Sequence, residues 1–173
     1  MKKLISAAIV AGALFMGAAP VYAAKPDAYT FDKVHTQIFF SVSHLGFSFS
    51  TGSFTGFDGG FTFSEEKPEQ SSVNVTIDAS SLSLHDAKWE EHVKSADFLN
   101  VAEHPSISFK STKVEKTGDN TGRITGDLTL HGVTRPMTLD VTFNGGATDI
   151  TARLLAQELT TALGQSFVVE NRG

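Results

Sequence analysis

The feature that most constrains the fold is an alternation of apolar and polar residues that extends from Tyr29 to Phe143. Successive side chains of a β-strand point to opposite faces of a sheet, so such a run predicts a strand with one buried and one solvated face. Burial on one side only is typical of antiparallel sheets. The runs that show the alternation are Ile38–Val42, Phe61–Phe63, Val73–Ile77, Ile107–Phe109, Leu128–Leu130 and Leu139–Phe143.

Short segments with turn-forming residues separate these runs, and one helix interrupts them. The helix is predicted at about Asp86–Ser95, where Glu90 and Lys94 have the i,i+4 spacing that stabilises a helix. Many short strands with a single helix predict an all-β fold, either a sandwich or an up-and-down barrel. The predicted turns are Thr51–Gly52, Asp58–Gly60, Gly118–Asn120 and His131–Gly132.

The pattern changes after Asn144, where alternation gives way to helical spacing. A stripe of apolar residues predicts a helix, which Thr148 or Asp149 can cap and Gly164 can end. A short apolar strand, Phe167–Val169, is predicted to follow the helix. The residues of the stripe are Ile150, Leu154, Leu155, Leu159 and Leu163.

Residues 1–23 have the composition of a secretory signal peptide. Lys2 and Lys3 precede an apolar run from Leu4 to Ala19, and small residues stand before the expected cleavage after Ala23. The run is shorter than the stretch of about 20 residues that a spanning helix needs, so a membrane anchor is the less favoured alternative. The sequence therefore predicts a periplasmic or secreted protein without a stable membrane anchor.

Charge and cysteine content exclude several classes of partner and site. Loss of Lys2 and Lys3 with the leader takes the formal net charge from −5 to −7, and the chain has no basic run. Phosphate contacts need Lys and Arg, so we expect no nucleic-acid partner. The absence of cysteine excludes disulfides, thiolate zinc sites, iron–sulfur ligation and cysteine nucleophiles.

No motif in the chain indicates catalysis. None of the six histidines stands two or four positions from another, and no HExxH pattern is present, so structural or surface roles are favoured over a metal site. Adjacent residues point apart, so Glu65–Glu66 and Glu90–Glu91 predict a solvated surface rather than an acid/base pair. We expect no enzyme, no catalytic residue, no metal and no cofactor. The histidines are His35, His44, His85, His92, His104 and His131.

The remaining candidate for function is the apolar face of the sheet. The chain holds 14 Phe against one Trp and two Tyr. An antiparallel barrel of about eight strands can hold one ligand. A Phe-rich lumen suits a long apolar molecule, because burial of each methylene group contributes about 0.8 kcal/mol. The alternative is that these side chains only pack against one another, and composition alone favours that alternative.

Several segments, in order along the chain, resemble the YceI-like, polyisoprenoid-binding family. The resemblance covers about residues 28–144. It implies a lipocalin-like antiparallel β-barrel that encloses an isoprenoid chain, such as a polyprenyl lipid or a quinone, without catalysis or metal. The segments are Tyr29–Thr36, Phe40–Phe47, Gly52–Gly59, His92–Leu99, His104–Thr112 and Gly126–Thr134.

The alternation and the resemblance together predict which residues line the lumen or its lid. We expect residues 24–144 to form this lipid-binding domain and residues 145–173 to form an atypical tail. A homodimer is counted among the candidate partners, beside the isoprenoid lipid or quinone. The predicted lumen residues are Phe40, Val42, Phe54, Phe61, Phe63, Val75, Ile77, Phe98, Ile107, Phe109, Leu128, Leu130, Leu139 and Val141.

The tail resembles a different family, the substrate-binding proteins of tripartite tricarboxylate transporters. The similar residues are Gly145–Gln157, Leu163–Gln165 and Val168–Arg172. A segment this short cannot build a two-lobed receptor, so carboxylate binding is not transferred to the chain. An anion contact through Thr148 and Asp149, at a helix N-terminus, stays as an alternative.

The change of family predicts a fusion-like junction near Asn144–Gly146 and the loss of the strand pair that closes the barrel. Strand Thr134–Phe143 and the first strand are then expected to expose their edges, which favours aggregation. Two outcomes are open. The leucine stripe of the tail covers the lumen, or the chain is a truncated or fused product that folds poorly and has no activity.

Overall fold

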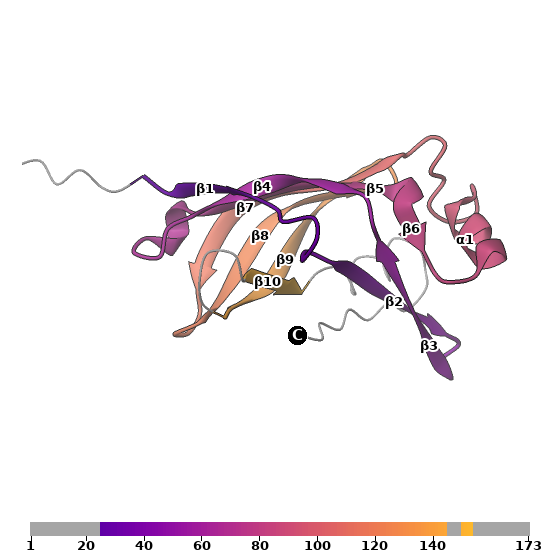
Figure 1. The fold of residues 1–173 in the computed structure, drawn as a ribbon, viewed down its shortest axis with the longest axis horizontal. Coiled ribbons are helices and arrows are strands. Elements are labelled where there is room, and N and C mark those ends of the chain that lie inside the picture. Colours follow the sequence, from indigo (N-terminus) through magenta and orange to yellow (C-terminus); the bar gives the residue numbers. More distant parts are fainter. Residues whose placement is uncertain (1–24, 145–149, 154–173) are drawn as a thin grey trace, which may run out of the picture.

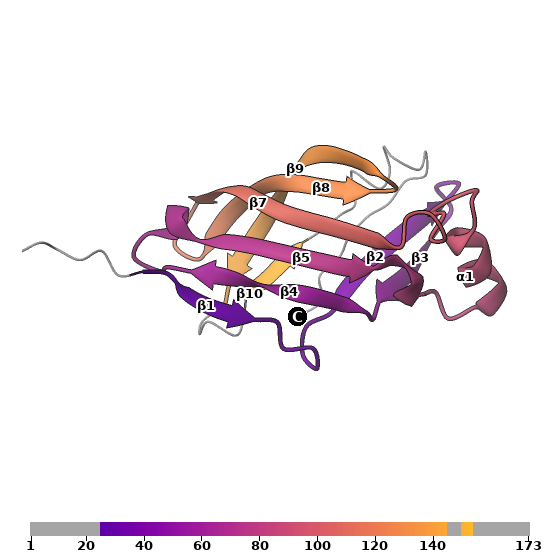
Figure 2. The same ribbon diagram turned by 90° about the horizontal axis from the view of Figure 1, so that it is seen from above.

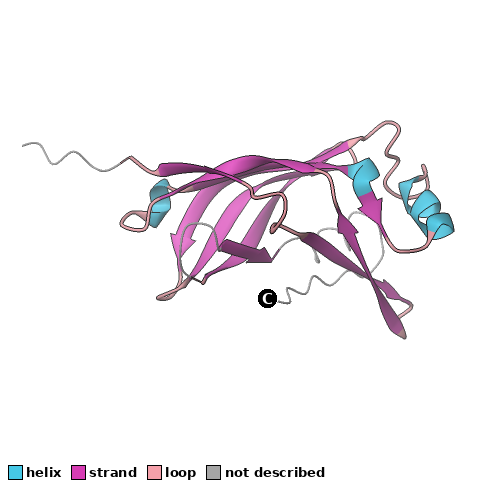
Figure 3. Ribbon diagram, in the orientation of Figure 1, coloured by secondary structure: helices cyan, strands magenta, loops and turns pink. Residues whose placement is uncertain are grey.

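The computed structural model describes residues 25–144 in full and the backbone of residues 150–153. In these residues the chain is mainly β-structure, with one α-helix and two short 3₁₀ helices (Figure 3). Every strand pair is antiparallel. The predicted all-β antiparallel fold is therefore confirmed. No helix in the described part of the chain is long and apolar enough to cross a bilayer.

Two sheets make up the fold (Figure 1). In spatial order, the seven-stranded sheet contains β1 (Asp27–Thr30), β4 (Phe57–Phe63), β5 (Ser72–Asp78), β7 (Ser106–Lys116), β8 (Thr121–Leu130), β9 (Val133–Phe143) and β10 (Ile150–Arg153). The three-stranded sheet contains, in order, β2 (Ile38–His44), β3 (Ser48–Phe54) and β6 (Leu82–Ser83).

The seven-stranded sheet is curled rather than flat. Neighbouring strands lie about 4.8 Å apart, so in a flat sheet the four steps from β4 to β9 would separate these strands by about 19 Å. The rings of Phe63 on β4 and Phe143 on β9 are nevertheless stacked, with centroids 5.3 Å apart. Figure 2 shows the strands side by side with β10 beneath them. The sheet therefore encloses one of its own faces.

The curled sheet does not close into a barrel within the described residues. β1 pairs only with β4, and β10 pairs only with β9. The incomplete barrel that the sequence predicted is confirmed in this respect. The expected free edge on β9 is partly covered, because β10 pairs with Asp140–Phe143 and leaves Val133–Leu139 without a neighbour on that side in the described chain.

The beginning of the tail differs from the prediction of a helix. Ile150–Arg153 form strand β10, in register with β9 from Ile150 opposite Phe143 to Arg153 opposite Asp140. The edge of β9 offers unpaired N–H and C=O groups, and pairing with them satisfies the backbone better than a marginal local helix. The signal peptide, Thr148, Asp149, the rest of the leucine stripe and Phe167–Val169 lie outside the described residues.

Two of the four predicted turns are confirmed. Gly118–Asn120 connect β7 to β8, and His131–Gly132 connect β8 to β9. His131 and Gly132 have φ values of 51° and 72°. Positive φ at both central residues matches a two-residue turn of type I′, which suits the twist of a hairpin.

The other two predicted turns are wrong, because both segments lie inside strands. Thr51 and Gly52 belong to β3, and Asp58–Gly60 belong to β4. Gly59 has a φ of 130°, and a Cβ atom there would stand 2.1 Å from the backbone oxygen of Asn74 on β5. This close approach of two strands requires glycine, so glycine serves the pairing here rather than a reversal of the chain.

The predicted helix is confirmed as α1 (Ala87–Lys94). Asp86 stands at the N-cap, and its carboxylate accepts a hydrogen bond of 2.9 Å from the backbone N–H of Trp89. The 3₁₀ helices are η1 (Pro68–Gln70) and η2 (Ala79–Ser81). η2 and β6 carry the chain from the large sheet to α1 at one end of the fold (Figure 1).

Candidate functional site

On the enclosed face of the large sheet, apolar residues of neighbouring strands stand opposite one another and form rows across the strands. Phe109 on β7 stands opposite Val75 on β5 and opposite Leu128 on β8. In the next row, Ile107 stands opposite Ile77. All five side chains are buried. The enclosed face is therefore continuous across β5, β7 and β8.

The opposite face of the same strands is polar. Its residues pair across the strands through hydroxyl groups and one exposed ion pair, as expected for a face in water. The pairs are Thr62 with Ser72 (2.8 Å), Thr125 with Thr138 (3.0 Å), Thr129 with Thr134 (2.8 Å) and Arg123 with Asp140 (3.1 Å). The division between the two faces shows which side of the sheet is available to an apolar molecule.

Aromatic rings gather at the end of the enclosed face where β4 and β9 approach each other. Phe61 stacks on Tyr29 of β1, with ring centroids 5.1 Å apart. Phe31 lies 5.9 Å from Phe61 and 6.1 Å from Phe57, which begins β4, so the aromatic contacts continue along this strand. Phe61 and Phe63 are half-buried, so part of each residue stays accessible to solvent. This end of the face combines aromatic character with accessibility.

The structure places the fourteen predicted lumen residues in three groups. Nine are buried in the core, and two more pack against it while half-buried. The remaining three are half-buried and do not belong to that cluster. The buried residues are Phe40, Phe54, Val75, Ile77, Ile107, Phe109, Leu128, Leu130 and Leu139. The half-buried residues are Val42 and Val141 beside the core, and Phe61, Phe63 and Phe98.

Phe98 lies apart from the other predicted residues. It follows α1, and its ring stands edge-on to that of His92 with centroids 4.9 Å apart. The family motif, rather than alternation in a strand, suggested this residue. Its position near the end of the fold that carries α1 separates it from the aromatic end of the enclosed face.

Several residues of the same face were not in the predicted set. Phe57 and Met137 are buried on β4 and β9, and Phe143 completes the stack with Phe63. The alternation contained the signal for Phe143, because it stands two residues after Val141. Tyr29 and Phe31 precede the first clear alternation, and only their pairing with β4 brings them to this face.

Two glycines, one in each sheet, make room for phenylalanine rings. A Cβ atom on Gly52 would stand 2.4 Å from Phe40 Cζ, and one on Gly126 would stand 2.5 Å from Phe109 Cζ. Each ring therefore covers the backbone of a neighbouring strand. The centre of the face is filled by protein side chains, whereas the aromatic end keeps accessible surface.

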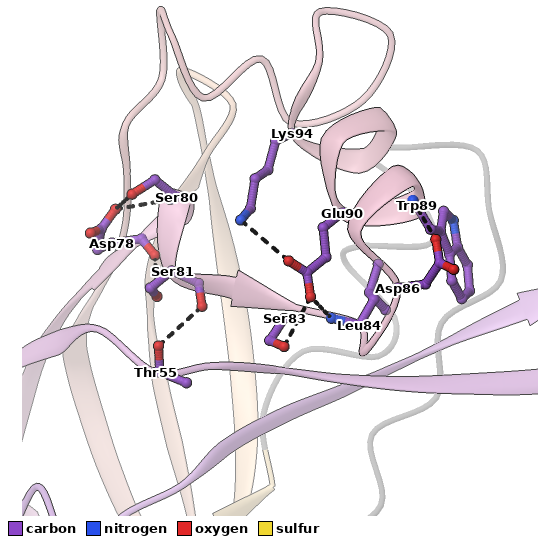
Figure 4. Close-up of polar contacts among 10 residues, drawn as sticks. All are labelled: Thr55, Asp78, Ser80, Ser81, Ser83, Leu84, Asp86, Trp89, Glu90 and Lys94. Carbon is purple, nitrogen blue, oxygen red and sulfur yellow. Dashed lines mark hydrogen bonds and ion pairs between the residues drawn. The ribbon is translucent and has the colours of Figure 1, made fainter.

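Polar contacts hold α1 against the end of the fold opposite the aromatic end (Figure 4). The Glu90 carboxylate accepts hydrogen bonds from the Leu84 N–H at 2.8 Å and from the Ser83 hydroxyl at 3.0 Å, and it lies 3.9 Å from Lys94 Nζ. These bonds and the nearby Lys94 charge hold the pKa of Glu90 below its ordinary value. The expectation that Glu90 only faces solvent is wrong, while the i,i+4 pair with Lys94 is confirmed.

Two histidines that are distant in sequence meet in the fold. The rings of His104 and His131 have centroids 4.5 Å apart, and no hydrogen-bond partner reaches the buried Nε2 of His131. Within the part of the chain described by the structure, no group of three or more His, Asp or Glu could hold a metal ion. The turn at His131–Gly132 and the loop before β7 bring the rings together, which no sequence spacing indicated.

Comparison with known proteins agrees with this architecture. A family model described as "YceI-like domain" matches residues 29–169, on both sides of Asn144. A UPF0312 protein of Pseudomonas savastanoi pv. phaseolicola is 43% identical over 151 residues, which cover 86% of this chain and 77% of that relative.

Two solved structures share the fold. BcnA of Burkholderia cenocepacia is 26% identical with a TM-score of 0.66, over 71% of this chain and 77% of that one. A polyisoprenoid binding domain from Saccharophagus degradans, implicated in plant cell wall breakdown, is 15% identical with a TM-score of 0.57, over 81% and 82% of the two chains. The family model and the identity to the UPF0312 relative establish that this chain belongs to the family of YceI-like domains.

Proposed function

We propose that the protein binds an isoprenoid-type lipid, a polyprenyl lipid or a quinone, against the enclosed face of the large sheet and without catalysis. The contact between Phe63 and Phe143 is the observation that carries the proposal. It turns the apolar face of an open sheet into a concave surface with aromatic walls. A ligand that lies in this concavity is shielded from water on several sides.

The accessible side chains at the aromatic end define the ligand class. Phe61, Phe63 and Val141 are half-buried and present aromatic or aliphatic surface there. A long hydrocarbon gains about 0.8 kcal/mol for each methylene that such a surface removes from water.

The family supports the same ligand class. The Saccharophagus degradans domain with the same fold is named for polyisoprenoid binding. An isoprenoid chain carries a methyl group and a planar double bond in each unit, and both can pack against aromatic rings. The leader-like residues 1–23 support a periplasmic location, where a carrier would hold such a lipid between membranes.

Binding can be tested with the isoprenoid alcohol farnesol and two variants of one strand. Phe63→Asp places a charge on the enclosed face, whereas Thr62→Asp places it on the polar face one residue away. We expect farnesol binding, measured by isothermal titration calorimetry, to weaken at least about tenfold in Phe63→Asp, since a tenfold change corresponds to 1.4 kcal/mol. Thr62→Asp should bind like the unchanged protein.

Two further ligands define the specificity. Ubiquinone-2 carries an isoprenoid tail on a quinone, and palmitate carries a straight chain of similar hydrophobicity. Binding of farnesol and ubiquinone-2 in preference to palmitate supports the isoprenoid class. Equal loss of farnesol binding in Thr62→Asp and Phe63→Asp, with both variants folded, would contradict the assignment of the ligand to the enclosed face.

A further inference from the structure

The hairpin formed by β2 and β3 exposes large apolar side chains at its tip. The exposed fractions are 78% for Leu45, 89% for Phe47 and 60% for Phe49. Figure 1 shows that the hairpin extends away from the large sheet. Single exposed apolar residues are common on protein surfaces, but three at one projecting tip form a patch that indicates an interaction.

The backbone of the tip is fixed so that these side chains face outward. The Phe47 N–H donates to the His44 carbonyl oxygen at 3.0 Å, and the Gly46 N–H donates to the Ser43 hydroxyl at 3.2 Å. Leu45 and Gly46 have φ values of 53° and 78°. A leucine in the left-handed region is unusual, and its backbone is held there while its side chain stays in water.

The hairpin carries no formal charge at neutral pH. No Asp, Glu, Lys or Arg occurs in the 24 residues between Lys33 and Asp58, although the chain average of 19% would place about five there. Lys33 and Asp58 form an ion pair of 3.4 Å with each other. β2 is seven residues long, so its far end lies about 23 Å from the tip at about 3.3 Å per residue.

We propose that the tip of the β2–β3 hairpin docks the protein on a lipid bilayer by inserting Leu45, Phe47 and Phe49 among the acyl chains. An uncharged apolar tip can enter hydrocarbon, where a charged side chain would be costly. The residues that flank these side chains are serines, Gly46 and His44, with no Asp, Glu, Lys or Arg among them, so the tip offers a charged protein partner no ion pair.

The inference rests on the proposed function, because a lipid carrier must collect its ligand from a membrane. The same hairpin connects the tip to the core. Phe40 on β2 is buried in the core, and half-buried Val42 lies between Phe40 and the tip. Leu45 lies five positions after Phe40, about 17 Å along the strand at about 3.3 Å per residue. Insertion of the tip would therefore bring the acyl chains close to the apolar interior.

Vesicle flotation provides the test, with the full mature chain and vesicles of phosphatidylcholine. We expect the unchanged protein to float with these vesicles at both low and high salt, since the tip carries no charge to screen. Phe47→Asp should reduce vesicle binding at least about tenfold. Val34→Asp is the matched control, because Val34 is 79% exposed but precedes β2, at the end of the hairpin away from the tip.

A fluorescent label gives a second measurement that does not depend on the stability of a charged variant. The chain has no cysteine, so Phe47→Cys and Val34→Cys each create a single labelling site. An environment-sensitive dye at position 47 should shift to shorter wavelength on addition of vesicles, and the dye at position 34 should not. Equal shifts at both positions would overturn the insertion of the tip.

The outcomes separate this inference from the proposed function. Flotation of Phe47→Asp equal to that of the unchanged protein overturns the docking inference, even if farnesol binds from solution. Loss of flotation with intact farnesol binding supports it. Failure of farnesol binding, with vesicle binding that depends on Phe47, leaves docking supported and refutes the proposed function. A dimer that Phe47→Asp dissociates, without vesicle binding, assigns the tip to a second copy of the chain and overturns the inference.

Discussion

The ring of Phe40 lies over the backbone at Gly52. This contact predicts that a methyl group added at position 52 destabilises the fold. A Cβ atom at position 52 would stand 2.4 Å from Phe40 Cζ and 2.8 Å from Leu84 Cδ2. Both neighbours are buried, so neither can move away freely. We expect Gly52→Ala to lower the free energy of unfolding by about 1–3 kcal/mol, the usual cost of overpacking a core.

A double-mutant cycle, measured by urea denaturation, identifies the ring as the cause. Phe40→Leu destabilises the protein by itself, but it also removes the Cζ and Cε atoms that the new methyl group would meet. Gly52→Ala should therefore cost less in the Phe40→Leu background than in the unchanged protein. An equal cost in both backgrounds would show that the clash lies elsewhere.

At the scale of elements, the Glu90 carboxylate of α1 accepts hydrogen bonds from Ser83 and Leu84, which precede the helix. Its bonds to the Leu84 N–H and the Ser83 hydroxyl favour the charged form and lower its pKa in the folded state. A carboxyl with a lowered folded pKa stabilises the fold above its unfolded pKa, and that contribution disappears as the pH falls through the folded pKa. We therefore expect part of the acid destabilisation to come from Glu90.

Thermal unfolding between neutral and acid pH measures this contribution. Glu90→Gln should have a lower Tm than the unchanged protein at neutral pH, and the difference should shrink below the ordinary pKa of glutamate. Glu91→Gln is the control, because Glu91 is exposed beside Glu90 in α1 and its side chain makes no hydrogen bond or ion pair within the described residues. A pH-independent difference for Glu90→Gln would argue against the charge as the cause.

The sequence predicted most elements because local patterns determine them. Alternation located the strand cores, and Asp86 with the Glu90–Lys94 spacing located α1. Glycine misled the prediction at Gly52 and Gly59, where it permits close packing inside a strand rather than a turn. The helical spacing of Ile150 with the leucines that follow it predicts a helix at Ile150–Arg153. These residues form a strand instead, because they pair with the free edge of β9.

At the scale of the whole molecule, the contacts that make the candidate site join distant parts of the chain. Phe63 and Phe143 are 80 residues apart, and Tyr29 reaches Phe61 only through the pairing of β1 with β4. Local periodicity identifies which residues face inward, but it cannot state how far the sheet curls. For the same reason, local periodicity could not predict the contact between the rings of His104 and His131, which the fold brings together.

The open sheet and its concave apolar face lead to the central claim, that the protein carries an isoprenoid lipid. Native mass spectrometry of the mature chain from the periplasm of a bacterial host, with organic extraction of the bound material, tests this claim most directly. We predict one isoprenoid molecule per chain and a narrow charge-state distribution that indicates a folded protein. A folded chain without lipid, or one that carries only straight-chain phospholipid, would contradict it.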